Sequence, residues 1–306
     1  MSRIRFLWLL VPALGIGELA LHVGFSKRAP RVDEWRELAA PVRRLKRPAD
    51  LLVVAPEWAE PIARHALGDE PFPLDQIARA DASSFVRALE ISALGARAGE
   101  TRGWRVASEE QSGRFTLRVL ENPAPIAPKY RFVDHVTPET LEVALVSGEL
   151  ETPCAFSDRA PVTAGGLHGH ATFPRERFRC PGGEASFVGI TVIDDQNYLP
   201  RRCIWAHPPE RGELRLRFRG VALGARLRAW AGLSYFLFRD GVGKPVTIAF
   251  RTAGHALGEH QHRDEWGFRA FSFATAAVAG QTSDVDVIVR AENAANRDFC
   301  FVAETL

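Results

Sequence analysis

The residues with the clearest potential for chemistry are three histidines, His255, His260 and His262, in the polar segment that follows Phe250. Imidazole nitrogens are ligands of zinc and other divalent ions. Because His260 and His262 are two residues apart, their side chains share one face if the backbone is extended. Glu259, in the same segment, is a candidate general base beside such an ion. The alternative is a solvated polar loop between two strands, because three histidines from one loop lack a fourth ligand from elsewhere.

Aromatic side chains in the same half of the sequence are candidates for binding a ligand. Flat rings exposed on a sheet face or a loop stack on the C–H faces of sugars with little loss of entropy. Trp230 and Tyr235 lie in an apolar stretch, and core packing is the favoured explanation for Trp230. Trp266 lies beside Asp264 in the polar histidine segment, so we expect its ring to be exposed. These four residues are the predicted ligand-binding set.

Motifs of other catalytic classes are absent from the sequence. The stretch from Gly232 to Phe236 departs from the G-x-S-x-G nucleophile motif at its last position. Neither G-x-G-x-x-G nor G-x-x-x-x-G-K occurs, so there is no phosphate cradle and we expect no nucleotide partner. The sequence requires no cofactor, although a divalent metal is compatible with the histidines. A non-catalytic protein is therefore favoured over an enzyme.

The charge balance argues against nucleic acid as a partner. The 306 residues include 39 basic and 37 acidic side chains, which gives a formal net charge of +2. Nearly all of the basic residues are arginine, which suits phosphate recognition when it is clustered. Here the arginines are scattered and nearly matched by acids, so no basic stripe forms.

An apolar run of twenty residues, from Phe6 to Phe25, lies close behind Arg3 and Arg5. About twenty residues are enough to cross a membrane as a helix. Three interpretations remain: a retained signal anchor, which we favour, a cleaved signal peptide, or a buried core helix. An anchor would hold the protein to the inner membrane by a single pass with its body in the periplasm, whereas cleavage would release a secreted protein.

The cysteines fit an exported protein. All four, Cys154, Cys180, Cys203 and Cys300, lie in the second half, and none forms the C-x-x-C pair typical of zinc ribbons. Behind an export signal, an even number of cysteines predicts disulfides. Three connectivities are possible; we favour Cys154–Cys180, which closes a glycine-rich loop, together with Cys203–Cys300, which ties an early strand to the last. Buried free thiols are the alternative.

The elements that must position these residues fall into two parts after the N-terminal segment 1–28. Residues 29–120 predict a small α/β domain, followed by a proline-rich linker at 121–129. Its expected elements are a divided helix over 33–47, a buried strand Leu51–Val54, helices over 57–67 and from Ser83 or Ser84 to Leu94, and a hairpin over 104–120.

Residues 130–306 predict an antiparallel β-sandwich. Leu214, Leu216 and Phe218 alternate with arginines, which is the pattern of a strand with one solvated face. About ten short segments of this kind, separated by turn residues, are typical of a sandwich with jelly-roll-like topology. The predicted fold class is therefore α+β.

The order of elements from Arg202 to Thr305 resembles that of galactose-binding-like jelly rolls and related carbohydrate-binding modules. The resemblance rests on the segments RCIWAHP, LRLRFRG, WAGLSYFLFRDG, PVTIAF, EWGFRAFSF, VDVIVRAEN and DFCFVAET. It covers about a third of the chain. It implies sugar binding by loops at one end of the sandwich, often with a structural calcium, although no residue here matches a calcium motif.

Two functional hypotheses follow. The favoured one is a membrane-tethered, exported accessory protein, non-catalytic, whose β-sandwich binds a cell-envelope glycan or an envelope protein. The alternative is an exported metal-dependent hydrolase with His255, His260 and His262 as ligands.

Overall fold

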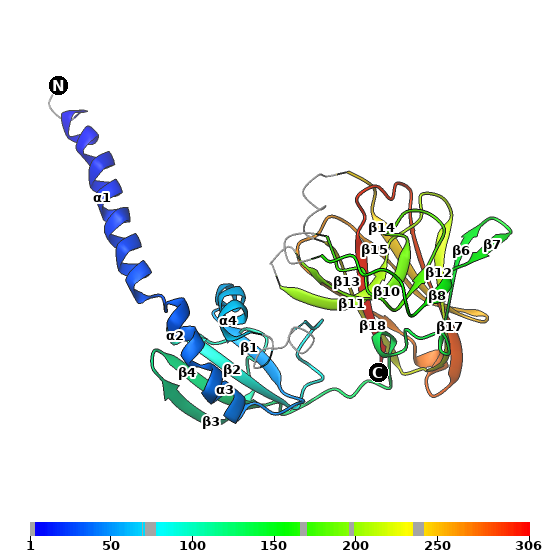
Figure 1. Ribbon diagram of the computed structural model, residues 1–306, viewed down its shortest axis with the longest axis horizontal. Helices are drawn as coiled ribbons and strands as arrows, with labels where there is room; N and C mark the ends of the chain where they lie inside the picture. Colours follow the sequence, from blue (N-terminus) through cyan, green and yellow to red (C-terminus); the bar gives the residue numbers. More distant parts are fainter. Residues whose placement is uncertain (1–3, 69, 71–77, 166–169, 196–198, 235–241) are drawn as a thin grey trace. The chain divides into compact units, whose positions relative to one another are not determined.

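The computed structural model describes residues 4–68, 70, 78–165, 170–195, 199–234 and 242–306 (Figure 1). The chain divides into two compact units. The first comprises Met1–Ile77 and Phe85–Pro125, and the second comprises Ala78–Ser84 and Ile126–Leu306. The short segment Ala78–Ser84 therefore belongs to the second unit although the first unit surrounds it in sequence.

The N-terminal segment forms one long helix, α1, from Ile4 to Arg28 (Figure 1). Its apolar side chains between Val11 and Val23 are exposed. Residues 6–10 and 25 of the predicted apolar run have side chains outside the described part of the structure. Among the residues that are described, no helix is both long enough and apolar enough to span a membrane.

The first unit packs helices against one face of a small mixed sheet. Its strands lie in the order β1-β2-β4-β3; β1 and β2 are parallel and the other pairs are antiparallel. The strands are β1 Leu51–Ala55, β2 Arg87–Ala93, β3 Arg105–Ser112 and β4 Phe115–Glu121. The helices are α2 Val32–Glu37, α3 Ala39–Leu45, the 3-10 turn η1 Glu57–Ala59 and α4 Glu60–Leu67. The buried strand, the helix over 57–67 and the hairpin were predicted correctly.

The predicted helix ending at Leu94 is wrong, because most of this segment is strand β2. Leu89 and Ile91 alternate into the core that the helices cover. Glu90 lies on the opposite face, where its carboxylate pairs with Arg118 at 2.9 Å. Hydrogen-bonded neighbours on both sides of β2 outweigh the local spacing of apolar residues that predicted a helix.

The second unit is a sandwich of two antiparallel sheets around one large core. One sheet has the order β16-β13-β18-β11-β10-β9-β8, with β5 paired to β18, and the other has the order β15-β14-β17-β12-β6-β7. The strands are β5 Tyr130–Arg131, β6 Leu141–Ser147, β7 Leu150–Pro153, β8 Ala155–Ser157, β9 Arg177–Arg179, β10 Phe187–Asp194, β11 Pro200–Ala206, β12 Glu213–Ala222, β13 Arg226–Leu233, β14 Val246–Thr252, β15 His255–His262, β16 Arg269–Ala274, β17 Thr282–Ala291 and β18 Phe299–Thr305. This arrangement confirms the predicted β-sandwich.

Strand β12 shows why the sequence folds this way. Its residues Leu214, Leu216 and Phe218 are buried in the core between the sheets. The arginines that alternate with them face outward, where Arg217 donates two hydrogen bonds, of 2.7 and 2.8 Å, to Asp286 on neighbouring β17. Period-two alternation thus places one set of side chains inside and pairs the other set across strands.

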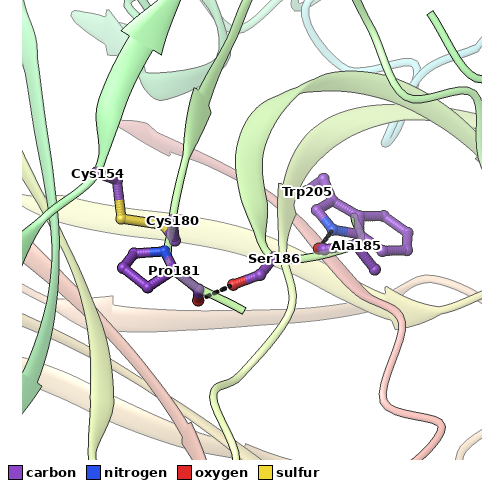
Figure 2. Close-up of a disulfide and its surroundings, with 6 residues drawn as sticks. All are labelled: Cys154, Cys180, Pro181, Ala185, Ser186 and Trp205. Carbon is purple, nitrogen blue, oxygen red and sulfur yellow. Dashed lines mark hydrogen bonds between the residues drawn. A yellow bond between two sulfur atoms is a disulfide. The ribbon is translucent and has the colours of Figure 1, made fainter. Parts of the chain in front are cut away.

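The structure contains both disulfides in the favoured pairing, Cys154–Cys180 and Cys203–Cys300. Cys203 lies on β11 and Cys300 on adjacent β18, in a smaller cluster that also holds Trp205. Figure 2 shows the first disulfide and the segment that follows it. Ala185 lies in this segment, and its carbonyl accepts a hydrogen bond of 2.9 Å from the Trp205 indole of β11. Two disulfides are typical of proteins in oxidising, extracytoplasmic compartments.

Candidate functional site

The histidine segment lies at an edge of the sandwich, where the chain passes from one sheet to the other. His255 to His262 form strand β15, which is paired with β14 at the edge of its sheet. Residues 263–268 then lead into β16, the edge strand of the facing sheet. The segment is therefore a strand followed by a short turn, and the expected polar loop over 255–262 is wrong.

Because β15 is extended, His260 and His262 share one face, as their spacing predicts, and this face points between the sheets. On β14 they lie opposite Ile248 and Val246, which are both fully buried. The His260 ring stacks on Phe271 of the facing sheet, with 4.0 Å between ring centroids. The His262 ring centroid is 6.0 Å from that of Phe299 on β18. Two imidazoles thus occupy positions that a sandwich normally fills with apolar side chains.

Three of the four ring nitrogens of His260 and His262 are buried without a hydrogen-bond partner among the described residues. His262 is 1% exposed, and neither of its ring nitrogens has a hydrogen-bond partner among the described residues. The Nε2 atom of His260 is buried and likewise lacks a described partner. Burial lowers the pKa of His262 to about 4, assisted by neighbouring His260, and burial also lowers the pKa of His260. Both rings are therefore neutral near pH 7, the form that binds metal ions.

Glu265 completes a cluster with the two histidines. One ligand atom from each of His260, His262 and Glu265 lies within 4.8 Å of the others. The carboxylate Oε2 of Glu265 is 3.9 Å from Nδ1 of His262. This role of Glu265 was not predicted, because only the turn after β15 returns the residue toward its own strand. A carboxylate three residues after an H-x-H pair was the available signal.

The remaining residues of the hydrolase hypothesis do not join this cluster. His255 begins β15, opposite Thr252, and is exposed. At about 3.4 Å per residue it lies roughly 17 Å along the strand from His260. Glu259 faces away from the two histidines and pairs with Arg290 of β17 at 3.2 Å. The grouping of His255 with His260 and His262 is therefore wrong, and Glu259 is too far round the strand to act as their base.

Beside the histidines, Trp266 is exposed, as the sequence predicts, with 57% of its surface accessible. The turn that carries it is held at several points. The backbone N–H of Glu265 donates to the Arg263 carbonyl at 2.7 Å, and Gly267 adopts a φ of +77°. The carboxylate of Asp264 pairs with Arg297, whose side chain is almost fully buried.

The chain on the far side of Trp266 is also fixed, because Phe268 packs directly over Gly232 of β13. A Cβ at Gly232 would lie 2.6 Å from the Phe268 ring, so only glycine allows this contact.

Of the other predicted ligand-binding aromatics, Trp230 does not reach this surface. Trp230 is 5% exposed, and its ring lies 4.6 Å from the Arg228 guanidinium carbon, a cation–π contact. Core packing, the explanation favoured for Trp230 from the sequence, therefore accounts for the residue, and its place in the predicted ligand-binding set has no support. Tyr235 lies outside the described residues.

Comparison with known proteins gives structural neighbours only. No protein-family model and no curated protein matches the sequence. The CBM51-2 and INT domains of ZmpB from Clostridium perfringens share 9% identity and a TM-score of 0.29, over 67% of this chain and 40% of that one. A family 16 carbohydrate-binding module shares 8% identity and a TM-score of 0.23, over 39% and 83% of the two chains. A cyclase from Fischerella sp. TAU shares 10% identity and a TM-score of 0.23, over 55% and 86%.

Two of these neighbours are carbohydrate-binding modules, the class that the C-terminal third resembles in sequence pattern. The chain spans less than half of the ZmpB structure. TM-scores of this size carry no inference about function.

Proposed function

We propose that this protein is a non-catalytic, extracytoplasmic binding protein whose β-sandwich holds a glycan against Trp266. The single observation that supports this most is the exposure of an indole ring on a turn whose neighbours are fixed. Sugars present apolar C–H faces that stack on flat aromatic rings. An exposed tryptophan in a sandwich loop is a suitable platform for such a contact.

The fixed turn matters because it lowers the entropy lost on binding. The Asp264–Arg297 ion pair holds one side of Trp266, and the packing of Phe268 over Gly232 holds the other. A ring that is already in place gives more affinity per contact than one that must be ordered. Asp264, two residues before Trp266 in the sequence, carries a carboxylate of the kind that accepts hydrogen bonds from sugar hydroxyls.

The location outside the cytoplasm is supported by the two disulfides, which persist in oxidising compartments. We further propose that the N-terminal segment tethers the protein to a membrane. Its support is the exposure of apolar side chains along α1, among them Val11, Leu14 and Ile16. Buried apolar surface would otherwise be expected for residues of this type.

The hydrolase alternative has less support. A hydrolytic metal centre needs a general base beside the bound water. Glu259 is directed to Arg290 on the other face of the sheet, and His255 is at the far end of β15. The geometry thus favours binding over catalysis.

A glycan array probed with the full chain tests the proposal. The wild-type chain should bind a defined class of envelope polysaccharide, and Trp266→Ala should lose most of that signal. Folding of the variant is checked by circular dichroism, which should be unchanged because Trp266 is exposed. No binding to any envelope polysaccharide on the array, together with hydrolysis of one of them, would favour the hydrolase hypothesis over the binding hypothesis.

A further inference from the structure

The row of side chains that β15 directs between the sheets is unusual for a sandwich core. Its members opposite Val246 and Ile248 of β14 are imidazoles, although both partners are fully buried apolar residues. Buried polar atoms without hydrogen bonds destabilise a fold, and they call for an explanation such as an ion or a role in binding. Valine or phenylalanine at these positions would satisfy packing alone.

We propose that His260, His262 and Glu265 bind one divalent ion of the zinc class. Neutral imidazole nitrogens and a carboxylate oxygen are a donor set that zinc, copper and nickel all accept in proteins. The buried nitrogens of both histidines have no competing hydrogen bond among the described residues. The site does not use the Trp266 ring and does not rest on glycan binding.

The distances require only a small adjustment. Bonds of about 2.0–2.1 Å in tetrahedral geometry place ligand atoms roughly 3.3 Å apart. The three candidate atoms now lie within 4.8 Å of one another. Glu265 has a side chain that is 43% exposed, so it is free to rotate toward the fixed rings, and its Oε2 is already 3.9 Å from His262 Nδ1. Three protein ligands would leave a fourth position for water or an exogenous oxygen.

The surrounding charges do not prevent a cation from binding. Arg297 and Arg269 are close enough to act on His262 electrostatically, and so is Asp264. The Asp264 carboxylate is paired with Arg297 and offsets its charge. Glu265 supplies a further negative charge directly at the site. The two rings are neutral, so the protein contributes one anionic and two uncharged ligands.

Calorimetric titration of the metal-free, untagged full chain with zinc chloride tests the site. Wild type should bind one equivalent. His262→Phe should weaken binding at least about tenfold, because removing even an indirect contact to a metal ligand weakens affinity by 10–100-fold. Phenylalanine suits the apolar surroundings of His262, so this variant is expected to fold. Glu265→Gln, at a partly exposed position, keeps the shape and provides the same test without disturbing the core.

His255→Ala is the matched control, because it removes a histidine from the same strand outside the cluster. Its zinc affinity should equal that of wild type. Trp266→Ala should also bind zinc normally, which separates this proposal from the glycan proposal. The metal site is refuted if folded wild type binds no zinc, or if His262→Phe and Glu265→Gln bind it as wild type does. Loss of binding in His255→Ala would refute it as well.

Discussion

At the scale of single residues, Tyr130 shows what the core of the sandwich imposes on a polar group. The residue is 8% exposed, and its hydroxyl has no hydrogen-bond partner among the described residues. Its ring stacks on His135 and meets Phe132 edge-on, so the aromatic part is well packed. Burial raises the pKa of Tyr130 to about 12, because the phenolate would lose its hydration.

This raised pKa predicts a specific loss of stability in alkali. The unfolded chain releases the phenolic proton near pH 10, whereas the folded chain keeps it until about pH 12. The stabilisation from Tyr130 is therefore fully present below pH 10 and is lost as the pH rises through 12. Tyr130→Phe should remove this dependence, so the difference in free energy of unfolding between variant and wild type should change by on the order of 2 kcal/mol from pH 9 to 12.

Urea unfolding of wild type and Tyr130→Phe at each pH measures this difference in free energy of unfolding. Contributions of the other ionising groups are the same in both chains and cancel. A constant difference across the range would show that the Tyr130 hydroxyl is solvated in the folded protein.

Some residue-level features of the site could be predicted and others could not. The shared face of His260 and His262 depends only on local extension, which the alternation of the region predicts. The approach of Glu265 depends on the turn at 263–265, and the separation of His255 depends on the length of β15. The spacing of Glu265 behind the H-x-H pair is a weak signal for the first, and the second has no signal in residue type or spacing. Burial of Trp230 agrees with the packing favoured from its apolar surroundings, although the residue is on the outer face of its sheet, opposite to core residues Ala229 and Ala231.

At the scale of elements, segment 78–84 is joined to the sandwich through β13. Arg228 of that strand donates to Glu304 of β18 at 2.8 Å and to the Ser83 hydroxyl at 2.8 Å. It also pairs with Asp81 at 3.1 Å. Since Glu304 is only 6% exposed, its carboxylate charge is stabilised mainly by the Arg228 guanidinium rather than by water. One arginine thus links two strands and a distant segment.

Replacing Arg228 by leucine should therefore be strongly destabilising. It leaves the Glu304 carboxylate buried without its partner, a change that costs roughly 3–5 kcal/mol. Arg226→Leu, at an exposed position two residues earlier on the same strand, is the control and should change stability by less than about 0.5 kcal/mol. Chemical denaturation of the three chains gives the comparison. Equal stability of both variants would mean that the Arg228 network contributes nothing.

Most elements were predictable where period-two alternation is strong, as in β12, β14 and β17. The segment of β2 was wrongly predicted as a helix because the strand is defined by its pairing with β1 and β4, which come from other parts of the sequence. The docking of Ala78–Ser84 on the second unit is likewise a non-local event. Nothing in that segment distinguishes it from the residues of the first unit that surround it.

At the scale of the whole molecule, the second unit is held by its core and by two covalent links of different reach. Cys203–Cys300 spans 97 residues of sequence and Cys154–Cys180 spans 26. The favoured pairing is confirmed, but the sequence alone left three connectivities open, because the strand order that places Cys203 beside Cys300 is non-local. Both links constrain the unfolded chain more than the folded one.

The longer link should stabilise the protein more. Removing Cys203–Cys300 by a double alanine substitution should lower the free energy of unfolding by about 3–5 kcal/mol, and removing Cys154–Cys180 by about 1 kcal/mol less. Urea unfolding under oxidising conditions measures both, and the fully reduced wild type serves as reference. A larger loss for the shorter loop would contradict the chain-entropy explanation.

Trp266 is proposed to supply the stacking surface for a glycan, and calorimetry with a polysaccharide selected on the array measures the contribution of its ring. Trp58 is a matched control, because it is 58% exposed against 57% for Trp266 but lies in the first unit. Trp266→Ala should weaken binding at least about tenfold, or about 1.4 kcal/mol. Trp266→Phe should retain part of the affinity, and Trp58→Ala should bind as wild type does. Undiminished binding by Trp266→Ala, or an equal loss in Trp58→Ala, would contradict the claim.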